Sequence, residues 1–454
     1  MKNMSIKNGY ANFLDKNYIF TYDGELLQLV PQDKNLNKPY DFLANQNQHF
    51  DYLECISVSN EKLYFLNVDL KVSSSSYIAK PAGYICFIND QIDTFQAITF
   101  KGESINLFFR PNHIIDKANT HVDYNTGGGV ITLNPFDKTT RIFNIEIEEM
   151  KAKVIVGVTQ PPEPTYMMKD YNLGKPTSLM RITFNEQKPI SKFIGIYLWV
   201  HNLFRFLYFR NDVDFKEINL EQYYDENKMI KVADVFLNKD DTIYDNINKT
   251  IGFYLIEHRL NEIAQIVNKK DLNLLFIPQN LSDDKYIDPQ KYMLCCASFE
   301  SVFNYIFPNA KADEKQKANE VKQEFLLYIE EKREAYKGKD LTKRKEFQKY
   351  AEMIEQFNFS LPEKFRYCKE KYHIKFGEYF SKIIERNQIS EDELLELPER
   401  FAKMRNLLVH SHLANFEPIH IVAYLFARAF IYVMILEKSG IEEKQIMQAI
   451  CNLL

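Results

Sequence analysis

The chain has 454 residues, of which 45% are hydrophobic and 14% aromatic, and its formal net charge is −5. A chain of this length is expected to form two or three domains, and its apolar content is enough to build sizeable cores. The negative charge excludes a simple basic nucleic-acid coat, because nonspecific phosphate binding requires a large cationic surface, so any contact with nucleic acid must be local.

The cysteines and the apolar stretches indicate in which cellular compartment the protein is expected. The six cysteines are scattered without a CxxC pair, which argues against a disulfide framework or a zinc site, and adjacent Cys295 and Cys296 are interpreted as small core residues. The first ten residues are polar and lack the apolar core of a signal peptide. The most apolar stretch, residues 421–436, is interrupted by Arg428 and is shorter than the roughly 20 residues of a membrane span. A soluble protein of the reducing cytoplasm is expected.

The N-terminal part has the pattern of β-structure. From residue 10 to about 185, short apolar runs alternate with turn residues, and the segment 141–148 alternates apolar and polar side chains one by one. Such runs are typical of strands and hairpins. We therefore expect residues 1–190 to form a β-rich N-terminal domain, either a sandwich or a distorted barrel.

Helical spacing begins near Ile190. A helix is expected around residues 193–207 and a second over 242–268, followed by a linker over 273–288, so residues 191–289 are predicted to be a helical connector. The apolar residues that share one face of the first helix are Phe193, Tyr197, Val200, Phe204 and Leu207.

Everything from residue 290 to the C-terminus is predicted to be helical. A charged helix over 311–337 should break at Gly338, the motif Ser390–Glu393 resembles a capping box, and further helices are expected over 398–413 and 420–438. The fold class is therefore α+β and multidomain, with an all-α bundle over residues 290–454.

A basic cluster lies within this bundle. Lys343, Arg344 and Lys345 follow one another in a segment that is rich in both basic and acidic side chains. The simplest interpretation is a solvated helix face, and the alternative is a patch that helps to hold RNA.

The segment Arg405–His412, with the sequence RNLLVHSH, combines residue types that suit phosphate chemistry. An RNA-cleaving site that works without a metal needs a histidine to move protons at the ribose 2′-hydroxyl or the leaving oxygen. It also needs a permanent cation to stabilise charge on the phosphorus oxygens, and the arginine fork matches phosphate geometry. Arg405 and His410 are the candidate pair, and no metal or other cofactor is predicted.

Helix geometry limits how these residues can cooperate. Asn406 and His410 are four apart and share a face, whereas Arg405 and His410 diverge by about 140° on an ideal helix. A joint role therefore requires a distorted turn or a second copy of the motif supplied by a dimer. His410 and His412 are two apart and point in different directions, so a metal pair is disfavoured and His412 is kept only as a supporting residue for phosphate binding.

Residues Arg405 to His410 resemble the R-x4–6-H signature of HEPN domains, in the version with a polar residue after the arginine. The segment 298–305 is similar to the first helix of that fold, so the likeness covers roughly 292–454. The layout of a β-rich region, a connector and a terminal bundle is similar to ApeA-like anti-phage HEPN proteins, over nearly the whole chain.

This resemblance implies a metal-independent endoribonuclease that cleaves cellular RNA, such as tRNA or single-stranded RNA, to 2′,3′-cyclic phosphate and 5′-hydroxyl ends. It implies a homodimer whose two motifs line one cleft, and a β-rich domain that regulates the toxin and meets a phage-derived trigger. Arg405 would bind the phosphate, His410 would move protons and Asn406 would orient one of them. Glu300 matches an acidic position of the first helix, although Asn304 stands where many members have a basic residue.

Two other functions remain open at this stage. A noncatalytic HEPN module that binds RNA, a nucleotide or a protein would bury Arg405 and His410 or pair them internally. A structural or interaction protein would depend on its β-rich half, and substitution of His410 would then change only its stability.

Overall fold

The computed structural model divides the chain into two compact units, each described here by itself. The β-rich unit comprises Met1–Tyr208 and Asp212–Glu257, and the helical unit comprises Phe209–Asn211 and His258–Leu454. The structure describes residues 6–13, 16–32, 47–73, 76–88, 91–116, 118–122, 129–130, 132–159, 176–225, 228–238, 242, 249–272, 274–308, 319–355, 360–410 and 415–454.

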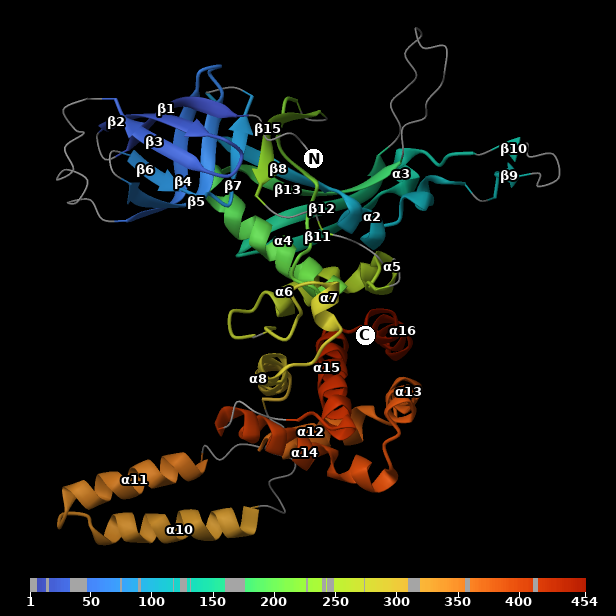
Figure 1. The fold of residues 1–454 in the computed structure, drawn as a ribbon. Helices are drawn as coiled ribbons and strands as arrows, with labels where there is room; N and C mark the ends of the chain where they lie inside the picture. The colour runs from blue at the N-terminus through green and yellow to red at the C-terminus, as the bar shows by residue number, and fades with distance from the viewer. Residues whose placement is uncertain are drawn as a thin grey trace. The chain divides into compact units, whose positions relative to one another are not determined.

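The β-rich unit is built on one large antiparallel sheet (Figure 1). Its strand order is β11-β12-β13-β8-β14-β15-β7-β5-β4-β1-β2-β3-β6, and an additional pairing of β5 with β6 closes six of the strands into a barrel. The strands are β1 (Lys7–Phe13), β2 (Lys16–Tyr22), β3 (Leu27–Pro31), β4 (Gln48–Ser57), β5 (Lys62–Ser73), β6 (Ser76–Ala79), β7 (Gly83–Phe87), β8 (Thr94–Lys101), β11 (Arg141–Ile147), β12 (Met150–Thr159), β13 (Thr177–Pro189), β14 (Glu217–Tyr223) and β15 (Met229–Leu237), with β9 (His121–Val122) and β10 (Gly129–Val130) paired separately.

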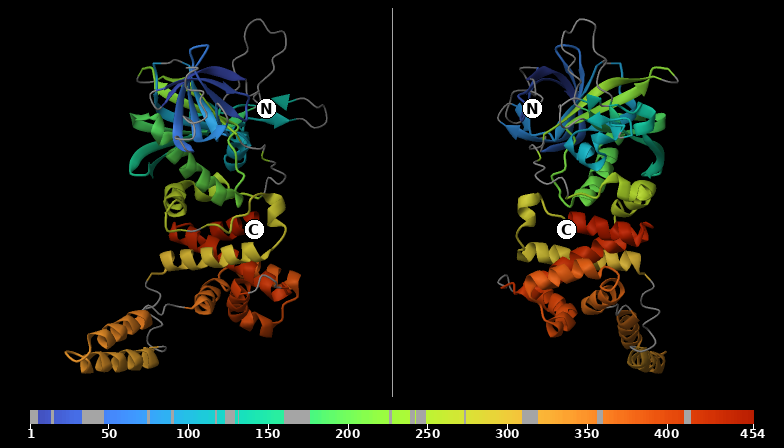
Figure 2. Two further views of the ribbon diagram at one scale, coloured as in Figure 1. Left: turned by 60° about the vertical axis from the view of Figure 1, so that its left-hand side comes forward. Right: turned by 90° about the vertical axis from the view of Figure 1, so that its right-hand side faces the viewer.

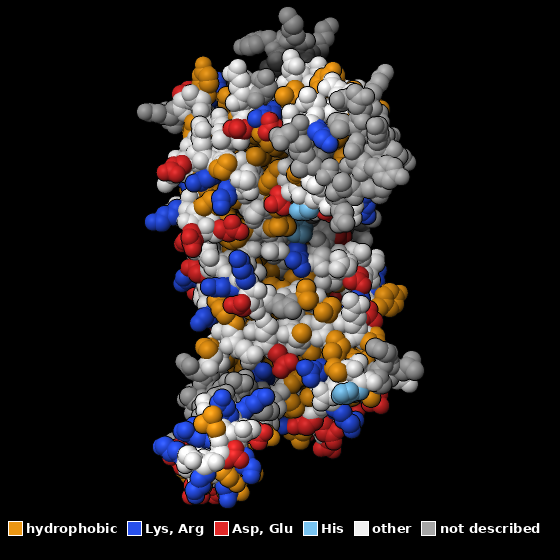
Figure 3. Space-filling model, turned by 90° about the vertical axis from the view of Figure 1, so that its left-hand side faces the viewer, with side chains coloured by type: hydrophobic (Ala, Val, Ile, Leu, Met, Phe, Trp, Pro, Cys, Tyr) orange, Lys and Arg blue, Asp and Glu red, His pale blue; other side chains and the backbone are white. Residues whose placement is uncertain are grey.

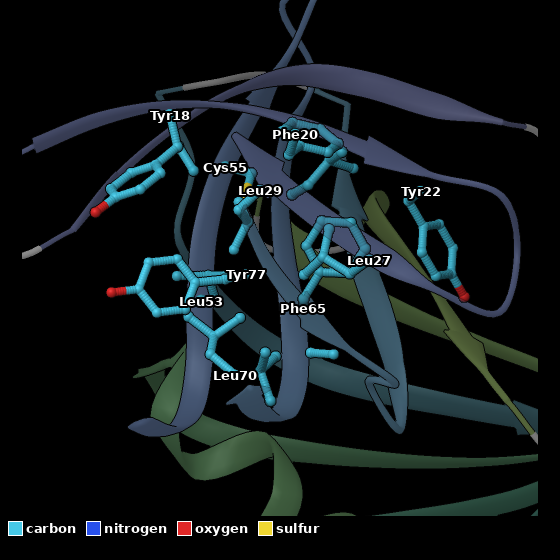
Figure 4. Close-up of a cluster of buried hydrophobic side chains, with 14 of the residues drawn as sticks. Tyr18, Phe20, Tyr22, Leu27, Leu29, Leu53, Cys55, Phe65, Leu70 and Tyr77 are labelled. Atoms are coloured by element: carbon cyan, nitrogen blue, oxygen red, sulfur yellow. The ribbon is translucent and has the colours of Figure 1, made fainter. Parts of the chain in front are cut away.

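Alternating side chains fill the barrel. In β2, Tyr18, Phe20 and Tyr22 are buried while the residues between them face outward, which is the period-two pattern expected of a strand with one solvated face. Phe65 lies 5.6 Å from Phe20 and 5.1 Å from Tyr22 between ring centroids, both edge to face (Figure 4). The expectation of a barrel-like β-rich region is confirmed, and aromatic packing forms its core.

The strands outside the barrel carry the remaining elements of this unit. Helix α4 (Phe193–Tyr208) packs on this part through Phe204, whose ring lies 5.2 Å from those of Phe108 and Phe215. The other short elements are α2 (Glu103–Phe108), η2 (Pro111–Ile114), α3 (Phe136–Thr139), η3 (Ile190–Lys192) and α5 (Phe253–Ile256).

The prediction of a helical connector over 191–289 is wrong for residues 217–237. These residues form β14 and β15, which insert into the sheet between β8 and β7. Both partner strands lie more than a hundred residues earlier in the chain, so the pairing is non-local and leaves no local periodic signal. Of the helix predicted over 242–268, the described residues 242 and 249–252 are not helical, and the helical part consists of α5, η4 (Glu257–Arg259) and α6 (Leu260–Val267).

The helical unit is a bundle around α15, as Figure 2 shows. Helices α8, α12, α13, α14, α16 and α6 all contact α15. The bounds are α7 (Leu281–Asp284), α8 (Pro289–Ile306), α10 (Asn319–Ala335), α11 (Leu341–Glu355), α12 (Leu361–Tyr372), α13 (Gly377–Asn387), α14 (Glu391–His410), α15 (Pro418–Lys438) and α16 (Glu443–Leu453).

Helix α15 is long and apolar enough to cross a membrane, yet 89% of its most apolar 18 residues are buried inside the structure. A helix that is hydrophobic all round belongs in a core when its neighbours cover it. Its buried Arg428 pairs with Asp284 at 3.1 Å and lies over the ring of Phe209 at 4.2 Å. These features are those of a helix buried in the core of the bundle.

Helix α14 begins as the sequence predicts and then runs further than expected. The backbone N–H of Ser390 donates to the Glu393 carboxylate at 2.9 Å, and the backbone N–H of Glu393 donates to Ser390 Oγ at 3.3 Å, which confirms the capping box. Pro398 does not end the helix. Because proline has no N–H, it leaves the carbonyl of Leu394 free, and Lys369 Nζ from α12 donates to that oxygen at 2.5 Å.

Substitution of Gly9 in β1 tests the packing of the barrel. A Cβ at Gly9 would lie 2.0 Å from the carbonyl oxygen of Ile56 and 2.8 Å from the ring of Phe20. We therefore expect Gly9→Ala to destabilise the β-rich unit by about 1–3 kcal/mol or more, the usual cost of overpacking a core.

The measurement is the unfolding of the full chain by differential scanning calorimetry. Gly195→Ala is the matched control, because its Cβ would meet only the flexible carboxylate of Glu148 at 3.2 Å and alanine favours α4. Equal stability of the two variants would contradict the barrel register.

Candidate functional site

The position of the motif follows from the buried stripe of α14. Leu397, Phe401, Met404 and Leu408 are spaced four, three and four apart and are all buried, so they form the face that packs inward. Asn406, Leu407, Val409 and His410 are exposed, and Arg405 is half-buried at the edge of the stripe. The burial pattern therefore holds the arginine beside the bundle and the histidine in solvent.

Arg405 lies near the acidic residue that the sequence singles out. Its Nη2 atom is 4.0 Å from Oε2 of Glu300 on α8, and its Nη1 donates to Oδ1 of Asn406 at 3.1 Å. The Arg405 side chain keeps 41% of its surface exposed. Three of the predicted site residues, Arg405, Asn406 and Glu300, therefore lie together, and the arginine is oriented by two neighbours without being buried.

The cluster includes a fourth residue, which was not identified from the sequence. Lys364 Nζ lies 3.3 Å from Oε1 of Glu300, and the lysine side chain is only 5% exposed. It stands on the buried stripe of α12, among Leu361, Phe365 and Cys368. A lysine at an apolar position of a helix was the available signal, because a buried cation requires an acidic partner.

Lys364 supplies a cation beside Glu300 that residue 304 does not supply. Asn304 is exposed one turn after Glu300 on α8. The cation beside Glu300 comes from α12, a separate helix, instead of from that position. The carboxylate of Glu300 thus faces two cations, one through each oxygen.

His410 is the last residue of α14 and is exposed. Within the described part of the chain, its side chain takes part in no hydrogen bond or ion pair. The helix is continuous from Glu391 to His410, so the distorted turn that would bring Arg405 and His410 together in one copy is not present. His412 lies outside the described residues.

The cysteine one turn before Glu300 is not available for chemistry. Burial raises the pKa of the Cys296 thiol well above its ordinary value, with the nearby Glu300 adding to the rise and Arg405 opposing it. Cys295 and Cys296 are both buried, as expected of core residues.

The basic cluster Lys343–Lys345 lies on α11, which packs against α10. Lys343 Nζ lies over the ring of Tyr336 at 5.3 Å, and Arg344 is 3.9 Å from the Glu334 carboxylate. Figure 3 shows basic, acidic and hydrophobic side chains intermingled over this hairpin. No ion pair or hydrogen bond among the described residues links the cluster to Arg405 or His410, so its role in holding RNA remains a prediction.

The Glu300 cluster generates a stability prediction. Because Lys364 is buried, Glu300→Ala should leave an uncompensated charge and lower the free energy of unfolding by about 3 kcal/mol. The double variant Glu300→Ala/Lys364→Met should recover most of that loss, since it removes the charge as well.

Urea unfolding of the single and double variants measures this coupling. Glu378→Ala is the control, because its ion pair with Lys382 is exposed and should contribute at most about 0.5–1 kcal/mol. Additive losses in the double variant would contradict the proposed interaction.

The start of α15 generates a pH prediction. The backbone N–H of Glu417 donates to Nδ1 of His420 at 3.2 Å, which requires that nitrogen to be unprotonated. Burial lowers the pKa of His420, Glu417 opposes the shift and Arg400 adds to it. Below the ordinary pKa near 6.5 the unfolded chain binds more protons than the folded one, so stability present above that pH should be lost as the pH falls.

Melting temperatures between pH 5 and 8 measure this dependence. His420→Gln should reduce the slope, because glutamine can cap the helix without titrating. It should not abolish the slope, since burial also lowers the pKa of His373. His258→Gln, at an exposed position, is the control, and an unchanged slope in His420→Gln would refute the assignment.

Comparison of the chain with models of protein families, with curated proteins and with solved structures finds no match.

Proposed function

We propose that the chain is a metal-independent endoribonuclease of the HEPN type, active on cellular RNA in the cytoplasm, and that it serves as a toxin in anti-phage defence. The observation that carries the proposal is the arrangement on α14. Arg405 is oriented by Glu300 and Asn406 but remains 41% exposed, and His410 is exposed. A phosphate can therefore reach the guanidinium, and RNA can reach the imidazole.

The proposed reaction uses only these side chains. His410 accepts the proton of a ribose 2′-hydroxyl, and the resulting oxygen attacks the adjacent phosphorus. The bond from phosphorus to the 5′-oxygen breaks, the leaving oxygen takes a proton from the protonated His410 of a second copy, and the products are a 2′,3′-cyclic phosphate and a 5′-hydroxyl. Arg405 stabilises the negative charge that develops on the phosphorus oxygens.

The reaction needs two copies of the motif. On one regular helix Arg405 and His410 diverge by about 140°, so a single copy does not present both to one phosphate. Two bundles facing each other would supply two histidines, one as base and one as acid. The exposed apolar side chains of Leu407 and Val409, at 47% and 50%, lie between the catalytic pair and would be covered in such a homodimer.

One observation favours the noncatalytic alternative. The approach of Arg405 to Glu300 is an internal pairing, which a module that binds RNA or a partner without cleaving it would also have. At 4.0 Å this pair is at the outer limit of an ion pair, so the guanidinium keeps donors for a phosphate. The roles of the β-rich unit as regulator and of a phage-derived trigger as its partner belong to the same proposal.

Cleavage of RNA in excess EDTA tests the function. Purified protein incubated with total tRNA and with single-stranded RNA should leave cyclic-phosphate ends, and His410→Ala or Arg405→Ala should lower the rate by at least about 100-fold. Matched controls are Lys403→Ala, an exposed cation of the same helix, and His258→Ala, an exposed histidine elsewhere in the helical unit. Both controls should keep the wild-type rate.

If the purified enzyme is inactive in vitro, growth of bacterial cells that express the wild type or each variant provides a second test. Toxicity that both motif substitutions remove, with soluble protein retained, supports the nuclease. RNA binding without cleavage or toxicity, lost in Arg405→Ala, would establish the noncatalytic module instead.

A further inference from the structure

A cavity of about 660 Å³ lies in the β-rich unit and shares no lining residue with the site of the proposed nuclease. Three segments of the chain line it: residues between 109 and 115 around η2, residues between 134 and 141 from α3 and its flanks to the start of β11, and residues between 253 and 257 around α5. Figure 1 shows α3, β11 and α5 in this part of the unit. All of these segments belong to one unit, so the cavity is a feature of that unit alone.

Three cations line this cavity. Arg141 is held in place, with Nε 3.1 Å from the Glu257 carboxylate and Nη1 donating to the carbonyl of Lys138 at 3.3 Å. Arg110 and Lys138 are exposed, and no acidic side chain of the described residues forms an ion pair with either. The cavity therefore has an excess of about two positive charges, which attract an anion.

Aromatic rings form another part of the wall. The ring of Phe109 stacks on the imidazole of His113 with centroids 4.8 Å apart, and the ring of Phe253 meets Phe109 edge to face at 5.2 Å. Tyr254 also lines the cavity, and its side chain is 56% exposed. Phe109 and Phe253 are buried and support this wall from behind, so the flat surface available to a planar group comes from the exposed rings of His113 and Tyr254. Such rings add nothing to the binding of a bare inorganic ion.

We propose that this cavity binds a phosphate ester of a planar ring, of the nucleoside monophosphate class. Arg110 and Lys138 hold the phosphate, with Arg141 fixed beside them, and the ring lies against the aromatic wall. The volume supports a ligand of this size, because sites for small molecules measure about 300–1,000 Å³ and inorganic phosphate fills only a small part of that space. This assignment is independent of the proposed ribonuclease activity, since the two sites share no residue.

Isothermal titration calorimetry of the full chain tests the site with AMP and UMP as probes, beside adenosine and inorganic phosphate. Both nucleotides should bind, and adenosine or phosphate alone should bind at least 10-fold more weakly. Arg110→Glu/Lys138→Glu should weaken nucleotide binding by at least 10-fold, because it replaces the two available cations with anions. Both side chains are exposed, so folding should be retained.

Two further variants separate the parts of the site. Tyr254→Ala should weaken AMP more than inorganic phosphate, since it removes only ring contact. Lys71→Glu/Lys153→Glu is the matched control, because it makes the same change of charge at exposed positions of β5 and β12 outside the cavity lining, and it should leave binding unchanged.

Three outcomes would overturn the proposal. The first is no binding of AMP or UMP at millimolar concentration, and the second is nucleotide binding that Arg110→Glu/Lys138→Glu leaves unchanged. The third is equal affinity for AMP and inorganic phosphate, which would make the cavity a simple anion site. None of these results bears on RNA cleavage by Arg405 and His410, so failure of one proposal is distinguishable from failure of the other.

Discussion

Burial of α15 is the constraint on which the helical unit depends. A helix that is apolar on every face must be covered on every face, and α6, α8, α12, α13, α14 and α16 provide that cover. The orientation of each covering helix is fixed, because its own apolar stripe must face α15. For α14 this fixes Phe401 and Met404 inward and thereby places Arg405 at the boundary, toward α8, with His410 in solvent.

The electrostatics of the candidate site follow from that packing. Glu300 is one residue beyond the buried Phe299 of α8, so its carboxylate emerges where α12 and α14 meet α8. Lys364 takes one carboxylate oxygen at 3.3 Å and Arg405 approaches the other at 4.0 Å. Loss of the carboxylate would cost more free energy at the buried lysine than at the exposed arginine, because an unpaired charge that is removed from water is strongly destabilising. Glu300 therefore orients the Arg405 side chain without neutralising its charge, and an arginine that binds phosphate requires both.

Local sequence signals predicted the class of each half and many of its boundaries. The alternation over residues 141–148, the break at Gly338 and the Ser390–Glu393 capping box are all decided within a few residues, and the structure has strand β11, the break and the capping box at these positions. The errors share one cause. The strands β14 and β15 exist because β8 and β7 are available beside them, and that information lies more than a hundred residues away. Likewise, the closure of the barrel depends on the pairing of β3 with β6, in which Leu27 lies opposite Ala79 although the two are far apart in the sequence.

The same distinction applies to the sites. Arg405, Asn406 and His410 could be found because they are neighbours in the sequence, and the divergence of Arg405 from His410 could be derived from helix geometry alone. Lys364 could not be placed beside Glu300, since 64 residues separate them and only the packing of α12 on α8 brings them together. The cavity of the β-rich unit could not be predicted from the sequence either. Its lining residues, such as Arg110, Lys138 and Phe253, come from separate segments of the chain.

The division into two units determines how the proposed sites could influence each other. The cavity belongs to the β-rich unit and the Arg405 cluster to the helical unit, and the chain passes between the units at residues 208–212 and 257–258. Phe209 is held in the helical unit by Arg428 and by the ring of Phe276, at 4.2 Å and 5.6 Å. Phe209 directly follows α4, so a ligand that changed the order of α4 would act on a residue anchored to the core helix α15. The proposed regulation by the β-rich unit would therefore act along the chain from α4 to Phe209, whose ring contacts Arg428.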